Sequence, residues 1–80
     1  MTTHERLRAI FRQALQLPPG TDVDTVAYRQ TPQWDSVAHM QLVSQLESAF
    51  GVMLETSEIL ELSNFEKAVA TVIKHGAPTT

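Results

Sequence analysis

The side chains that could do chemistry are few, and one group of them lies near the middle of the 80-residue chain. Asp35, Ser36 and His39 fall within one helical turn and are the residue types of a nucleophilic serine site. In such a site the acid and the serine hydroxyl bond to opposite sides of the histidine ring. Asp35 and Ser36 are consecutive and cannot take up these two positions, so the spacing argues against a hydrolase. His4 and His75 lie far from His39 in the sequence, and no metal site is predicted.

Ser36 remains as the candidate site, because it is expected in the first turn of a helix, after a long loop and beside a capping acid. A hydroxyl there is exposed, and the free N–H groups of a helix start favour anionic oxygens. It could accept a covalently attached, phosphate-bearing group, or it could be an ordinary helix-start serine, which the residues alone favour. The glycines are scattered, so no glycine-rich phosphate loop is predicted.

Composition limits the classes of function. Hydrophobic residues make up 42% and charged residues 19% of the chain, the mixture of a soluble globular domain. The chain contains no cysteine, which excludes disulfides and cysteine nucleophiles, and its net charge of −3 disfavours nucleic acid as a partner. No apolar run is long enough to cross a bilayer, so we expect a cytoplasmic protein without a membrane partner. So small a chain is expected to be a monomeric module that other proteins act on, not an enzyme.

Amphipathic segments must position Ser36. Thr2 and Glu5 have the spacing of a capping box, and Pro18 ends the helix that follows. The second helix is predicted to begin after Asp35 as N-cap and to end at Gly51. The apolar stripe of the first helix is predicted at helical spacing from Leu7, Ile10, Phe11, Ala14 and Leu15.

A short third helix is expected from Thr56 or Ser57 to Leu60, and a capping box of Ser63 and Glu66 introduces the last helix. The pattern predicts an all-α fold, a small four-helix bundle with three long helices and one short third helix. The single domain is expected to span residues 1–80, with its core at about 3–75 and a flexible tail at 76–80. The long connection at 18–34 is expected to be anchored by Val23, Val26 and Tyr28.

The motif around Ser36 has a family resemblance. Asp35-Ser36-Val37, followed by Leu42-Val43, Leu46-Glu47 and Phe50-Gly51-Val52, resembles the acyl carrier proteins, also called phosphopantetheine-binding carrier domains. The resemblance covers Leu7 to Ile73 and is to the standalone type. It implies that Ser36 is esterified with 4′-phosphopantetheine, which a phosphopantetheinyl transferase takes from coenzyme A. The arm's thiol would then carry the acyl group as a thioester, which accounts for the missing cysteines.

The resemblance also implies roles for the neighbours of Ser36. Asp35 would cap the helix and help to hold the transferase's metal–coenzyme A complex, and neither residue would catalyse. The second helix would be the surface that partner enzymes recognise, namely a loading ligase or acyltransferase and a ketosynthase or other downstream biosynthetic enzyme. The expected partner-binding residues are Val37, Met40, Gln41, Ser44, Glu47 and Ser48, with Glu58 and Glu61 from the third helix.

The chain from Asp35 to Glu66 has no lysine or arginine, so this stretch is acidic. However, Ala38, Gln41 and Ser48 stand where fatty-acid-synthase carriers often have acids. We therefore expect docking to depend on Val37 and Met40 more than on charge, as in a carrier dedicated to one pathway. Met40 could equally be packing filler.

Other residues near the site admit two interpretations each. Trp34 is expected to pack the loop on the bundle, with shielding of the arm as the alternative. His39 is expected to be a surface or hydrogen-bonded structural residue, with the entry of a cargo pocket as the alternative. The residues that could line such a pocket between the second and third helices are His39, Leu46, Leu54, Ile59 and Leu62, of which the aliphatic ones are core candidates first.

The pathway stays open between two kinds of carrier. The first interpretation is an acyl carrier of polyketide, fatty-acyl or other specialised biosynthesis. The alternative is an aminoacyl or peptidyl carrier loaded by an adenylating ligase, although the motif differs from the Gly-Gly-His-Ser pattern typical of those carriers. A third possibility is a helical adaptor that binds partners without a cofactor.

Overall fold

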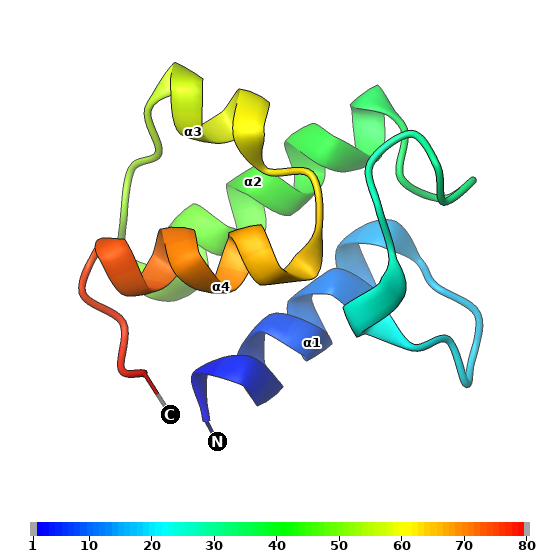
Figure 1. Cartoon of the computed structure of the whole chain (residues 1–80), viewed down its shortest axis with the longest axis horizontal. Coiled ribbons are helices and arrows are strands. Elements are labelled where there is room, and N and C mark those ends of the chain that lie inside the picture. The colour runs from blue at the N-terminus through cyan, green and yellow to red at the C-terminus, as the bar shows by residue number, and fades with distance from the viewer. Residues whose placement is uncertain (1, 80) are drawn as a thin grey trace.

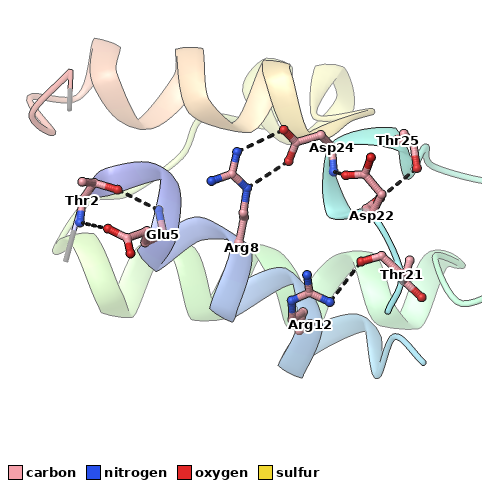
Figure 2. Close-up of polar contacts among 8 residues, drawn as sticks. All are labelled: Thr2, Glu5, Arg8, Arg12, Thr21, Asp22, Asp24 and Thr25. Carbon is pink, nitrogen blue, oxygen red and sulfur yellow. Dashed lines mark hydrogen bonds and ion pairs between the residues drawn. The ribbon is translucent and has the colours of Figure 1, made fainter. Parts of the chain in front are cut away.

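In the computed structural model, which describes residues 2–79, helix α1 (Thr3–Leu15) begins at the predicted capping box. The Thr2 hydroxyl accepts a hydrogen bond from the Glu5 N–H at 3.1 Å, and the Glu5 carboxylate accepts one from the Thr2 N–H at 3.0 Å (Figure 2). The helix ends before Pro18, where its end was predicted. Gln16 adopts the left-handed conformation with φ 50°, and its N–H bonds to the Arg12 carbonyl.

Helix α2 (Ser36–Phe50) has the limits that the sequence predicts. The Asp35 carboxylate accepts a hydrogen bond from the Ala38 N–H at 2.9 Å, and Gly51 ends the helix at φ 63°. Helix α2 packs most extensively against α1 and buries one face there. The buried residues of α2 are His39, Leu42, Val43 and Leu46.

Helices α3 (Thr56–Glu61) and α4 (Phe65–Lys74) follow, with α3 lying above α2 and α4 in the view of Figure 1. The predicted Ser63 cap of α4 is wrong by one residue: Asn64 caps the helix by accepting a hydrogen bond from the Lys67 N–H at 2.8 Å. The Ser63 carbonyl accepts a hydrogen bond from the Tyr28 N–H at 2.9 Å and ties the loop before α2 to the start of α4. The chain is still held beyond α4, where the Ala77 N–H bonds to the Val72 carbonyl at 3.0 Å.

Three aromatic rings join the helices and the loop in the core. Phe11 of α1 contacts Trp34 of the loop at 5.4 Å and Phe65 of α4 at 5.3 Å between ring centroids, both edge to face. All three rings are buried. The remaining buried hydrophobic residues are Leu7, Ala14, Leu15, Val23, Val26, Leu42, Val43, Leu46, Leu54, Leu62, Ala68 and Val72.

The long loop between α1 and α2 is tied to α1 by arginines, as Figure 2 shows. Arg8 forms two hydrogen bonds of 3.0 Å with the Asp24 carboxylate, and Arg12 donates to the Thr21 carbonyl at 3.0 Å. The hydrogen bonds from Arg8 hold the pKa of Asp24 below its ordinary value. The loop contains the 3₁₀ helix η1 (Val23–Thr25), so residues 18–34 are ordered around the predicted anchors Val23 and Val26. The all-α four-helix bundle is confirmed.

Candidate functional site

Ser36 is the first residue of α2 and is exposed. Asp35 precedes it in extended backbone conformation (φ −99°, ψ −173°), and its carboxylate bonds to the third N–H of the helix. The Ser36 hydroxyl therefore stands at the open end of a helix whose positive dipole end favours anionic oxygens. The arrangement suits Ser36 as a point of attachment for a phosphate-bearing group.

The loop leading to Ser36 is held by backbone hydrogen bonds. The Arg29 N–H donates to the Trp34 carbonyl at 3.1 Å, and the Trp34 N–H donates to the Thr31 carbonyl at 2.9 Å. An antiparallel bridge between Ala27 and Asn64 ties the same loop to the start of α4. The loop that precedes Ser36 is therefore held both by its own backbone hydrogen bonds and by its bridge to the start of α4.

A buried relay of hydrogen bonds runs under the site. The Trp34 Nε1–H donates to His39 Nδ1 at 3.0 Å, and His39 Nε2 lies 2.8 Å from the Ile59 carbonyl. Indole is only a donor and a carbonyl only an acceptor, so His39 is neutral with its proton on Nε2. The relay joins the loop, α2 and α3, which is the hydrogen-bonded structural role expected for His39. Trp34 is fully buried in the packing role expected of it.

The candidates for a cargo pocket lie in or beside the core. Leu46, Leu54 and Leu62 are buried, and Ile59 is half-buried. Two surface hollows occur elsewhere among the described residues. The larger, about 300 Å³, lies between the end of α1 and the start of α2, and its lining includes Leu15, Gln33, Asp35 and Gln41. The smaller, about 270 Å³, is lined by His4, Asp24, Phe65, Glu66 and Val69.

The predicted partner-binding residues of α2 are mostly on the surface. Val37 and Met40 are 69% and 55% exposed, so Met40 is not packing filler, and Gln41 and Ser44 are also exposed. Glu47 is half-buried, and its carboxylate accepts a hydrogen bond from the Leu54 N–H at 2.9 Å. We refer to Val37, Met40, Gln41 and Ser44 as the α2 surface.

The assignment of Glu58 to a docking surface is wrong, because Glu58 is only 8% exposed. Its carboxylate lies 2.9 Å from His75 Nε2 and 3.5 Å from Lys74 Nζ, and it accepts a hydrogen bond from the Glu55 N–H at 2.9 Å. That backbone hydrogen bond, followed by the interaction with His75, lowers the pKa of Glu58. Glu58 therefore fastens α3 to the end of α4 and does not face a partner.

The sequence analysis did not predict the contact of Tyr28 with Ser36 or the exposure of two apolar residues. Tyr28 was expected to be a loop anchor, but its hydroxyl lies 3.3 Å from Ser36 Oγ. Met53 and Leu60, which lie beside and on α3, are 82% and 76% exposed. The exposure of Leu60 follows from the turn of a six-residue helix, which was too short for periodicity to assign its faces.

Comparison with known families shows which class of protein this chain belongs to. A family model described as a phosphopantetheine attachment site matches residues 5–72, which is most of the chain. The chain belongs to the phosphopantetheine-binding carrier protein family. Searches of curated proteins and of solved structures found no match. The adaptor without a cofactor is thereby set aside.

Membership of the carrier family implies a covalently attached 4′-phosphopantetheine, a transferase that modifies the chain, and biosynthetic enzymes as partners. Carrier domains of this family are generally non-catalytic. The site fits the group, because Ser36 offers an exposed hydroxyl at a helix start. None of the helices in residues 2–79 is long and apolar enough to cross a membrane.

Proposed function

We propose that this carrier protein is an acyl carrier that bears 4′-phosphopantetheine on Ser36 and presents acyl intermediates to the enzymes of a polyketide, fatty-acyl or other specialised pathway. The exposed Ser36 hydroxyl at the capped start of α2, inside the matched segment, is the observation that supports attachment at this residue. The arm supplies a thiol that carries acyl groups as thioesters.

The residues of the chain hold the attachment oxygen and do no chemistry on the cargo. Asp35 fixes the start of α2, where Ser36 lies, by accepting a hydrogen bond from the Ala38 N–H. By the family resemblance, Asp35 also contributes to binding of the transferase's metal–coenzyme A complex. The carrier acts as a monomer in the cytoplasm, and partners include a loading ligase or acyltransferase and a downstream enzyme such as a ketosynthase.

The α2 surface is proposed as the partner-binding surface, with Glu47 at its edge. Its apolar members, Val37 and Met40, are exposed and lie close to Ser36 in sequence and on the same helix. Isolated exposed apolar residues need no explanation, but the pair stands next to the attachment serine, where a partner must approach. Because neither side chain is in the core, Val37→Ala and Met40→Ala should weaken binding of the loading enzyme while the free energy of unfolding changes by less than about 0.5 kcal/mol.

The cargo is tested by the mass of the protein isolated from its native host. Intact mass and fragmentation of the ejected arm should show an acyl thioester on wild-type protein, and Ser36→Ala should show no adduct. An aminoacyl thioester would contradict the acyl assignment and support the carrier loaded by an adenylating ligase. An adduct that persists in Ser36→Ala would contradict attachment at Ser36.

A further inference from the structure

The phenol of Tyr28 lies beside the attachment oxygen, and the carrier function as proposed does not use this contact. Tyr28 Oη is 3.3 Å from Ser36 Oγ, and either hydroxyl can donate the hydrogen bond. Tyr28 belongs to the loop before α2 and is separated from Ser36 by eight positions in sequence. The folding of the loop, not sequence spacing, brings the two hydroxyls together.

The Tyr28 ring is held in place from several sides. It packs on the His39 ring with 4.7 Å between centroids and on the Trp34 ring with 6.0 Å. Its backbone N–H donates to the Ser63 carbonyl at 2.9 Å. His39 is itself fixed by its bonds to Trp34 and Ile59. Because the ring is already ordered, a hydrogen bond from its hydroxyl to a ligand loses little conformational entropy.

Few positively charged residues lie near Ser36 in the sequence, so an uncharged group can serve as the hydrogen-bond donor to an anion there. Asp35 is a neighbouring carboxylate, and no lysine or arginine occurs from Asp35 to Glu66. The closest base before Ser36 in the sequence is Arg29, which follows Tyr28. A phosphodiester at Ser36 is an anion, and a hydrogen bond to an ionised oxygen is about twice as strong as one between neutral groups.

We propose that the Tyr28 hydroxyl donates a hydrogen bond to a phosphate oxygen of the arm on Ser36, so that Tyr28 positions the root of the arm against the loop. The direction of donation follows from the chemistry of the site. An esterified Ser36 Oγ has lost its proton and can only accept, which leaves the phenol as the donor of the pair. This inference rests on the proposed attachment at Ser36.

The test compares wild-type and Tyr28→Phe proteins after transfer of phosphopantetheine, with loading first verified by intact mass. Phenylalanine keeps the ring packing and removes only the hydroxyl. The ³¹P NMR resonance of folded wild-type protein should be displaced from that of the same protein unfolded in urea. In Tyr28→Phe the folded resonance should move toward the unfolded position, while the urea midpoint remains close to that of the wild type.

A second measurement needs no variant, because Tyr28 is the single tyrosine of the chain. Its ring proton signals should differ between the unmodified and the modified protein. Arg29→Gln serves as the matched control and should leave the ³¹P resonance in place. A resonance that moves in Arg29→Gln but not in Tyr28→Phe would overturn the proposal.

The outcomes also separate this proposal from the carrier function. Wild-type protein that takes up phosphopantetheine but has the same ³¹P shift as Tyr28→Phe would overturn the role of Tyr28 alone. Wild-type protein that takes up none at Ser36 would overturn both the attachment site and the contact proposed for it.

Discussion

Replacing His39 by leucine removes both hydrogen bonds of the buried relay while keeping an apolar side chain of similar size. The Trp34 Nε1–H and the Ile59 carbonyl would each lose their partner, 3.0 Å and 2.8 Å away in the wild type. A buried group left without its hydrogen bond costs about 1–3 kcal/mol. Two such groups cost about 2–6 kcal/mol, and the apolar leucine regains about 1.5 kcal/mol, so we expect His39→Leu to lower the free energy of unfolding by about 0.5–4.5 kcal/mol.

This loss is large for a domain of this size. At about 0.05–0.15 kcal/mol per residue, the whole chain has a stability on the order of 4–12 kcal/mol. Urea unfolding followed by far-UV circular dichroism measures the change, and the single tryptophan, Trp34, gives a second probe by fluorescence. The matched control is His39→Gln, whose amide can accept from the indole and donate to the carbonyl, and which should lose less stability than His39→Leu.

A double-mutant cycle with Trp34→Phe isolates the indole hydrogen bond. In the Trp34→Phe background only the Ile59 carbonyl is left unpaired by His39→Leu, so the cost should fall by about 1–3 kcal/mol. An equal cost in both backgrounds, or a change below about 0.5 kcal/mol for His39→Leu alone, would refute the relay. So small a change for His39→Leu would instead support the alternative interpretation, in which His39 lies at the entry of a cargo pocket.

Three further changes test the packing of the core, the cap of α2 and the loss of stability at acid pH. Leu46→Ala in the fully buried core of α2 should cost about 2–5 kcal/mol in urea unfolding, and a cost near zero would contradict its place in the core. Asp35→Ala should cost about 0.5–2 kcal/mol through loss of the cap, whereas Asp35→Ser should be nearly neutral because serine can replace the acceptor. The folded pKa of Glu58 lies below its ordinary value of 4.5, so its stabilisation is complete above that pH and is lost as the pH falls through the lowered pKa. Glu58→Gln should flatten this part of the pH dependence of stability, and an unchanged loss of stability at acid pH would contradict the lowered pKa of Glu58.

The helix limits that the sequence predicted best depend on short-range chemistry. The capping box of Thr2 and Glu5, the Asp35 cap and the Gly51 terminator each involve residues within a few positions of one another. Such signals can be found in a sequence without knowledge of the rest of the fold. The predicted cap of α4 was wrong by one residue, because Ser63 and Asn64 are both good capping residues and the sequence does not show which of them the helix follows.

The contacts that could not be predicted join residues far apart in the chain. Glu58 meets His75 across 17 positions, and His39 meets the Ile59 carbonyl across 20 positions. Periodicity assigns a residue to a face of its own helix but says nothing about its partner on another helix. An unpaired glutamate is almost always exposed, so Glu58 was placed on the surface until its partners were known. The contact of Tyr28 with Ser36 could not be predicted either, because it depends on how the loop folds.

The measurement that tests attachment at Ser36 most directly is the intact mass of the purified protein after incubation with coenzyme A, Mg²⁺ and a broad-specificity phosphopantetheinyl transferase. Wild-type protein should gain the mass of one phosphopantetheinyl group, and peptide mapping should place it on Ser36. Ser36→Ala should gain nothing under the same conditions, although it keeps the Asp35 cap and the four helices. No gain by the wild type, or an equal gain by Ser36→Ala, would contradict the attachment of the arm at Ser36.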